Sequence, residues 1–189
     1  MIGFEDETWW SRLARPSLHS WTDSDQNLRL VELSVPKEDK TPKALACYGM
    51  LLHYQGEKGE PCEQIKLRFV EGQPVSVATK AFLEWSCEKI TELGKKTLLL
   101  IWDNATWHKS QAVEKWIGDH NQQVKKERQG VRIVSCLLPK KSPWLNPIEP
   151  HWVHGKRQIV EPDRVLTLQE VIDRVYDYFG LPVQGYLTL

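Results

Sequence analysis

Apolar residues in the first part of the chain alternate with polar residues or form short runs, which is the pattern of β-strands. Residues that favour turns, several of them proline or glycine, separate the later runs. The segments that we predict as strands are Ile2–Glu7, Leu28–Val35, Ala44–Tyr54 and Ile65–Val70. The chain is therefore expected to begin with a β-rich part.

The apolar spacing changes to that of a helix after residue 73. Pro74–Leu93 is the predicted helix, and Gly94 is its expected C-cap. The positions expected to face the core are Leu83, Cys87 and Ile90. Beyond it we predict a strand at Thr97–Asp103, a helix at Ser110–His120, a strand at Val131–Leu138, and helices that open near Asn146 and near Thr167, the last with Thr167 and Glu170 at capping-box spacing. Thr97–Asp103 is apolar on both faces, as in a central strand, so the order predicts a mixed α/β domain built on one sheet.

Composition places the chain among globular proteins. Its 189 residues are enough for one domain with a substantial core, and 41% are hydrophobic and 26% charged. The run Leu98–Trp102 is too short to cross a bilayer, and the N-terminus lacks the pattern of a signal peptide. Four cysteines are dispersed without a CxxC pair, which favours reduced thiols in a cytosolic protein over disulfides or zinc.

The formal net charge is zero, but the charges are unevenly distributed. Between Asn104 and Arg157 the lysines and arginines clearly outnumber the acidic residues. This asymmetry permits a local surface that binds a polyanion.

Two acidic residues, Asp103 and Glu149, lie at the end of a predicted strand and near the start of a predicted helix. Asp103 closes the apolar strand, and ligands of open α/β sheets gather beyond the carboxyl ends of strands. From the local sequence, the interpretation that Asp103 and Asn104 simply form a turn has about the same weight as a functional role for Asp103. For Glu149, local pattern favours a capping role, with Asn146 as the N-cap, Pro147 as the first helical residue and Glu149 reaching back to the cap.

A third acidic residue lies in the run Glu5-Asp6-Glu7 at the end of the first strand. Such runs usually form a solvated edge. Alternation places Asp6 on the face of Ile2 and Phe4, so we expect Asp6 to be the acid that points inward.

Three segments match motifs of a known family. They are Phe4–Arg12 (FEDETWWSR), Trp102–Lys109 (WDNATWHK) and, after Leu138-Pro139, Ser142–Glu149 (SPWLNPIE) with Trp152 beyond it. The last is the most specific, because S-P-x-L-N-P-I-E followed by an aromatic residue is hard to meet by accident. On these residues the chain resembles the catalytic domain of DDE-type transposases, specifically bacterial insertion-sequence transposases of the mariner-like superfamily. The resemblance covers essentially the entire chain and keeps the family order.

The resemblance implies a ribonuclease H-like fold, an α/β fold with a mixed five-stranded sheet flanked by helices, in which the first and fourth strands are neighbours. It implies that Asp6, Asp103 and Glu149 are catalytic and hold two Mg²⁺ or Mn²⁺ ions for cleavage and strand transfer at DNA phosphodiesters. Oxygen ligands suit these ions better than zinc.

The resemblance also implies a supporting group around the acids, made up of Asn104, His108 and Asn146. For His108, a place near a phosphate or in a polar network and the role of a plain turn residue have equal weight. The basic residues expected to contact DNA are Lys109, Lys140, Lys141, Lys156 and Arg157. The last two would also complement the dipole at the end of a helix.

Tryptophan is frequent, and most of the nine tryptophans are expected in the core. Trp85 and Trp116 lie on apolar helical faces and Trp102 in the buried strand. Trp9, Trp10 and Trp144 are better candidates for contact with DNA, although packing beneath the site is favoured for them too.

Family members usually carry an N-terminal helix-turn-helix region, whereas residues 1–189 are interpreted as a single DDE catalytic domain without one. We therefore expect a DNA-binding N-terminal half to be encoded separately or missing, and a homodimer when two element ends are synapsed. The interval between Asp103 and Glu149 is longer than in mariner relatives. We expect the excess at Asp119–Gly130, as a surface loop or a helix extension.

The predicted function is thus metal-dependent DNA transposition in the bacterial cytoplasm, at the nucleoid and away from membranes. One alternative is a catalytically silent remnant that only binds DNA or a partner. A weaker alternative is a ribonuclease H or junction resolvase, against which the Asn-Pro-Ile-Glu block argues.

Overall fold

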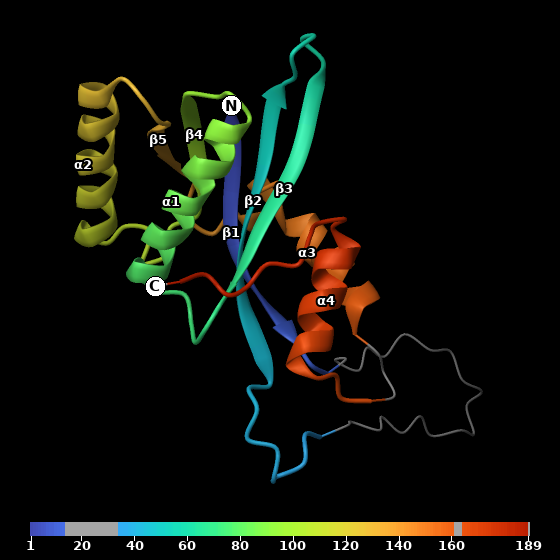
Figure 1. Cartoon of the computed structure of the whole chain (residues 1–189). Helices are drawn as coiled ribbons and strands as arrows, with labels where there is room; N and C mark the ends of the chain where they lie inside the picture. The colour runs from blue at the N-terminus through green and yellow to red at the C-terminus, as the bar shows by residue number, and fades with distance from the viewer. Residues whose placement is uncertain (14–33, 161–163, 189) are drawn as a thin grey trace.

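The computed structural model of the chain describes residues 1–13, 34–160 and 164–188. Its strands are β1 (Ile2–Ser11), β2 (Ala44–Gln55), β3 (Pro61–Val70), β4 (Thr97–Trp102) and β5 (Arg132–Leu137). Its helices are α1 (Ser76–Glu92), α2 (Gln111–Glu127), the single 3-10 turn η1 (Pro143–Leu145), α3 (Glu149–Ile159) and α4 (Leu168–Tyr178). Figure 1 shows the central strands between two pairs of helices.

The strands form one mixed sheet in the order β3-β2-β1-β4-β5. The first strand lies in its centre, antiparallel to β2 and parallel to β4, as expected for neighbouring first and fourth strands. The register pairs Phe4 with Ile101. Two residues further along these parallel segments stand Asp6 and Asp103, so the register itself brings both acids to the same level of the sheet.

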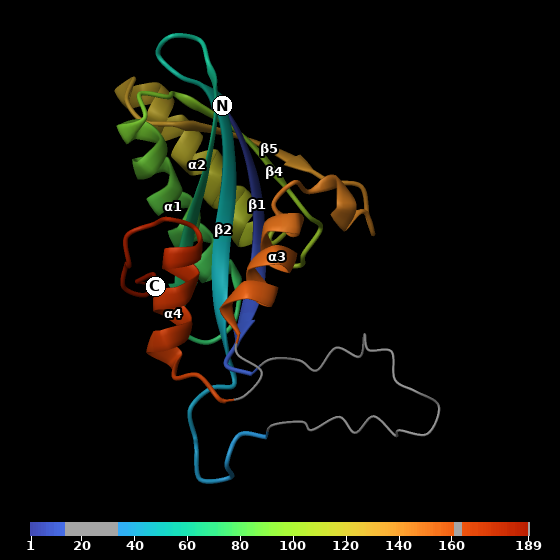
Figure 2. The same ribbon diagram turned by 90° about the vertical axis from the view of Figure 1, so that its right-hand side faces the viewer.

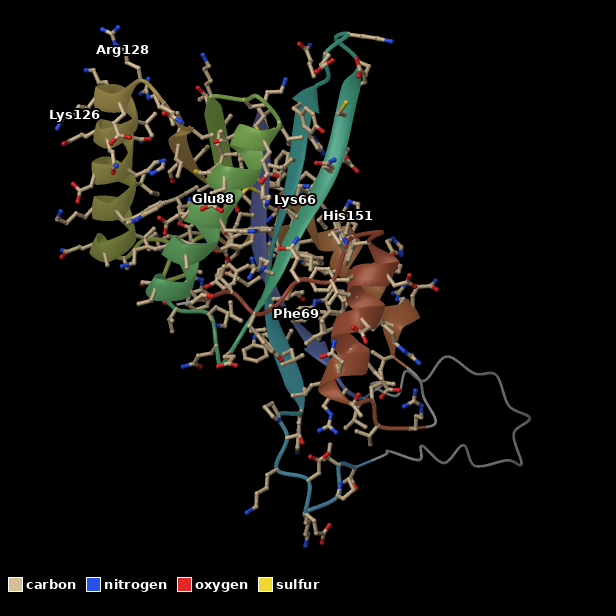
Figure 3. The ribbon with its side chains drawn as sticks, in the orientation of Figure 1. Lys66, Phe69, Glu88, Lys126, Arg128 and His151 are labelled. Carbon is tan, nitrogen blue, oxygen red and sulfur yellow. The ribbon has the colours of Figure 1, made fainter. Side chains whose placement is uncertain are left out.

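Helices cover both faces of the sheet. On one face, α1 and α2 enclose a core that includes Tyr48 and Phe82. On the other face, α3 and α4 enclose a second core that includes Trp10 and Phe69 (Figures 1 and 2). Phe69 projects from β3 toward α4, where its ring meets that of Tyr176 with centroids 5.9 Å apart (Figure 3). Because β1 has helices on both sides, its side chains can be buried on either face.

Several boundaries differ from the prediction, and each difference has a tertiary cause. β1 continues to Ser11 because β2 pairs with it along its whole length. The second helix continues to Glu127, so most of Asp119–Gly130 is a helix extension, one of the two forms expected. Lys126 and Arg128 project from its far end into solvent (Figure 3). Most of the strand predicted at Leu28–Val35 lies outside the described residues.

The helix ends follow the sequence more closely. Gly94 follows α1 with φ of 68°, the left-handed conformation that glycine adopts most easily. Thr167 and Glu170 form the predicted capping box at the start of α4. All four cysteines are free thiols, in agreement with their spacing. Within the described segments, no helix has both the length and the apolar character needed to cross a membrane.

Candidate active site

Three carboxylates converge from three elements. Asp6 lies in the middle of β1, Asp103 directly follows β4, and Glu149 is the first residue of α3. Burial, followed by the charge of Glu149, raises the pKa of Asp6 to about 8. Burial also raises the pKa of Glu149, with Asp103 acting in the same direction and Lys156 opposing it. The three groups predicted from the sequence therefore lie close enough to repel one another.

Helix α3 is fixed against β1 by Trp152. Its indole Nε1 donates a hydrogen bond to Asp6 Oδ2 over 2.9 Å, and its ring packs edge-on against Trp10 with centroids 5.9 Å apart. Gly49, the residue of β2 paired with Asp6, leaves room for this ring. A Cβ at Gly49 would lie 2.3 Å from Trp152. The helix that carries Glu149 can therefore approach the sheet closely.

The capping role considered for Glu149 is wrong. The helix begins at Glu149 itself, with Ile148 at the N-cap and no side-chain hydrogen bond there, and Pro150 in the first turn. Asn146 is buried, and its Nδ2 donates to the carbonyl of Glu5 over 3.0 Å. Asn146 therefore anchors the entry to α3 on β1, while the carboxylate of Glu149 is not used as a cap.

His108 connects Asp103 to the other face of the sheet. One ring nitrogen, Nδ1, lies 2.9 Å from Asp103 Oδ1, and Nε2 lies 3.0 Å from Glu7 Oε1. Burial opposes a charge on this imidazole, but Glu5, Asp103 and Glu7 together raise its pKa to about 11. Its ring also stacks on Trp102 at 4.5 Å. Of the two interpretations of His108, the polar network is the one that the structure contains.

The same contact acts on Asp103. The hydrogen bond from His108 is the main cause that lowers the pKa of Asp103, despite some desolvation. The backbone N–H of Ala105 also donates to its Oδ1, over 2.7 Å. Asp103 is thus held as a carboxylate at the strand end.

Glu5 and Glu7 were missed by the sequence interpretation, which expected Asp6 alone to point inward. Glu5 is fully buried, and its Oε2 lies 3.2 Å from His108 Nε2 without hydrogen-bond geometry. Burial, followed by the charge of Glu7, raises the pKa of Glu5. Glu7 Oε1 also accepts a hydrogen bond from Trp107 Nε1 over 2.6 Å. Period-two alternation would have paired Glu5 with Glu7 if β1 had been placed in the centre of the sheet.

Within the described residues, Glu5, Glu7 and His108 also form a group whose possible metal-binding atoms all lie within 4.8 Å of one another. This group lies on the face of β1 opposite to Asp6. Its internal hydrogen bond and ion pairs satisfy His108 without a cation.

The remaining predicted residues lie around these acids. Asn104 donates from Nδ2 to the carbonyl of Leu138 over 2.5 Å, which ties the ends of β4 and β5 together rather than contacting an acid. Lys109 lowers the pKa of Asp103, as Lys156 does for Glu149. The side chains expected to contact DNA are all exposed: Lys109, Lys140, Lys141, Lys156 and Arg157.

The three tryptophans considered for contact with DNA differ in burial. Trp10 is 1% exposed and belongs to the core, as the packing alternative predicted. Trp9 is 46% exposed and Trp144 is 74% exposed. Packing beneath the site is therefore wrong for Trp144.

Comparison with known proteins identifies the family. The family model described as DDE superfamily endonuclease matches residues 62–172, more than half of the chain. The chain belongs to the DDE superfamily of endonucleases. A search of curated proteins gave no match.

Solved structures show the same fold. The Mos1 transposase paired-end complex with the left transposon end is 15% identical with a TM-score of 0.61, and 96% of this chain aligns with 48% of that chain. The Mos1 mariner paired-end complex with Mn is 17% identical with a TM-score of 0.58, over 95% of this chain and 48% of that one. This DDE endonuclease chain thus has the expected ribonuclease H-like fold and spans about half the length of those transposases.

Proposed function

We propose that this DDE endonuclease chain is the catalytic domain of an insertion-sequence transposase, which cuts DNA strands and joins them to a target. Asp6, Asp103 and Glu149 are the proposed catalytic residues. The observation that carries the proposal is that these three carboxylates, from β1, the end of β4 and the start of α3, lie near enough to shift one another's pKa, in a member of this superfamily.

The three carboxylates suit divalent cations. Burial is the main cause that raises the pKa of Asp6 and of Glu149, and repulsion among the acids raises both further. A bound cation would relieve that repulsion. A set made only of carboxylate oxygens favours Mg²⁺ or Mn²⁺. When bound, two such ions would activate a water or a 3′-hydroxyl and stabilise the leaving oxygen at a DNA phosphodiester.

The chain's own residues orient the acids. Trp152 holds one oxygen of Asp6 and leaves the other for a ligand. His108 holds Oδ1 of Asp103 through its Nδ1 in the same way. Glu7 contacts the other ring nitrogen, Nε2, and so fixes the orientation of the imidazole. Asn146 sets the entry to α3 and hence the position of Glu149. Hydrogen bonds of this kind around metal-binding carboxylates typically affect metal affinity or activity about 10- to 100-fold.

Basic side chains surround the acids on the exposed side. Lys109 and Lys156 lie close enough to Asp103 and Glu149 to lower their pKa values. Together with Lys140, Lys141 and Arg157 they would neutralise DNA phosphates that flank the cut. We further propose a DNA-binding N-terminal half, encoded separately or missing, and a homodimer that synapses two ends in the bacterial nucleoid.

Nicking of supercoiled plasmid in the presence of Mn²⁺ tests the proposal. The wild-type chain, fused to a helix-turn-helix domain whose site is in the plasmid, should nick it. Asp103→Asn and Glu149→Gln should each lower the rate by at least about 100-fold, because each removes a charged metal ligand. Glu127→Gln, at the exposed end of α2, should leave the rate unchanged. Nicking that survives both active-site substitutions would contradict the proposed mechanism.

Calorimetry with Mn²⁺ distinguishes the enzyme from a silent remnant. Binding that is lost in Glu149→Gln supports the enzyme. A chain that binds DNA but takes up no Mn²⁺ at these acids would be a DNA-binding remnant. Cleavage of an RNA–DNA hybrid in preference to duplex DNA would indicate a ribonuclease H instead.

A further inference from the structure

Trp144 is the most exposed large hydrophobic side chain among the described residues, at 74% of its accessible surface. It lies in η1, on the segment between β5 and α3 that projects from the side of the sheet in Figure 2. Tryptophan is the largest side chain, and an exposed indole keeps its apolar surface in contact with water. By contrast, Trp10 and Trp152 are almost completely buried, and Trp9 is 46% exposed.

The segment that carries Trp144 has charged residues of one sign only. The stretch from Leu137 to Ile148 contains no acidic residue, whereas Lys140 and Lys141 are both exposed. A flat aromatic ring beside cationic side chains suits a nucleotide, whose base offers an apolar face and whose phosphate offers a negative charge.

Trp144 is close in sequence to a residue that bonds to the strand carrying Asp6. Asn146, two residues further on, donates its side-chain hydrogen bond to the carbonyl of Glu5, the residue before Asp6. Consecutive Cα atoms are about 3.8 Å apart, so the backbone of Trp144 lies within roughly 8 Å of that of Asn146. Trp144 therefore lies on the short segment that leads from Leu137 to Glu149, and its exposed ring is five residues before that proposed catalytic acid.

We propose that Trp144 stacks on the base of an unpaired nucleotide next to the scissile phosphate, while Lys140 and Lys141 contact the neighbouring phosphates. This inference rests on the proposed DNA substrate. The nucleotide must be unpaired, because the faces of a base inside a duplex are covered by its neighbours. Stacking of this kind tolerates any base, so it would hold the strand at the site without reading its sequence.

Binding to tailed DNA tests the stacking. Glu149→Gln protein, which is blocked in cleavage but keeps the whole chain, is titrated with a duplex that carries a single-stranded 3′ tail and with a blunt duplex. The tail carries 2-aminopurine, whose fluorescence is quenched by stacking. Adding Trp144→Ala should weaken binding of the tailed duplex by roughly 5- to 150-fold, the range for loss of one base–aromatic stack, and abolish the quenching.

Controls separate stacking from other roles. Trp144→Tyr should retain most of the affinity, and Leu145→Ala, at a 47% exposed neighbour, should change it little. Equal weakening of blunt and tailed DNA would overturn the proposal, as would unchanged binding. A change in self-association by sedimentation, without an effect on tailed DNA, would assign Trp144 to a protein contact and would also overturn it. Because binding is measured without cleavage, failure here differs from failure of the nuclease assay.

Discussion

Trp152 Nε1 donates a hydrogen bond to Asp6 Oδ2 over 2.9 Å, which joins α3 directly to the central strand. The same ring is almost completely buried between the helix and the sheet. One side chain thus packs the helix that carries Glu149 and orients the carboxylate of Asp6. Trp152 therefore links the position of Glu149 to the orientation and pKa of Asp6.

Replacing Trp152 by Phe should separate these two roles. The substitution keeps an aromatic ring in the core but removes the donor that lowers the pKa of Asp6. We expect a stability loss of roughly 1–2 kcal/mol and a drop in Mn²⁺ affinity of about tenfold. Chemical denaturation and calorimetry measure the two effects. A drop in stability with unchanged Mn²⁺ affinity would show that the hydrogen bond does not orient Asp6.

Gly49→Ala should displace α3 from the sheet. The new Cβ would lie 2.3 Å from the Trp152 ring and 3.2 Å from Ile148, so the variant should lose about 1–3 kcal/mol of stability. Gly118→Ala is the matched control. Apart from its chain neighbours and the backbone of α2 itself, no atom lies within 4 Å of its Cβ position, so it should gain roughly 0.5–1 kcal/mol. Denaturant unfolding of both variants checks this, and equal effects at the two glycines would contradict the packing.

Asp6→Asn should stabilise the chain when divalent cations are chelated. Burial and the charge of Glu149 oppose ionisation of Asp6, so in EDTA near pH 8 the neutral amide should raise the unfolding free energy by about 1 kcal/mol. Mn²⁺ should then raise the melting temperature of the wild type but not of the variant. Glu88→Gln, on the exposed side of α1, serves as the control. A wild type that melts at the same temperature with and without Mn²⁺ would count against metal binding here.

The ion pair between Arg12 and Asp39 should make stability depend on acid pH. Their side chains meet over 2.7 Å, while Arg12 Nε also donates to the carbonyl of Leu166. The hydrogen bond from Arg12 is the main cause that lowers the pKa of Asp39. A lowered folded-state pKa contributes stability that is present above the unfolded value, about 4, and is lost as pH falls through the folded value.

Asp39→Asn should therefore be less stable than the wild type near neutral pH, and the difference should shrink as pH is lowered from about 4 toward 2. Urea titrations of both proteins at several pH values measure this. A difference that stays constant over that range would show that ionised Asp39 does not stabilise the fold.

The sequence determined most of the local structure, because local structure depends on short-range rules. Helical spacing placed α1, and the pair Thr167–Glu170 fixed the start of α4. The apolar character of Thr97–Asp103 on both faces correctly predicted a central strand. The acids Asp6 and Asp103 could be proposed as a pair only through the resemblance, because they are far apart in sequence.

Tertiary structure decided the surroundings of those acids. Whether Glu5 is solvated or buried depends on what covers both faces of β1, and that is set by helices more than 70 residues away. The helix α3 starts at Glu149 rather than nearer Asn146, whose side chain instead bonds to β1. Local pattern thus specified strands, helices and candidate acids. Which acids lie near one another was decided only by the packing of α3 and of residues 103–108 on β1. Charge repulsion and burial depend on the neighbours that a group acquires in the folded chain.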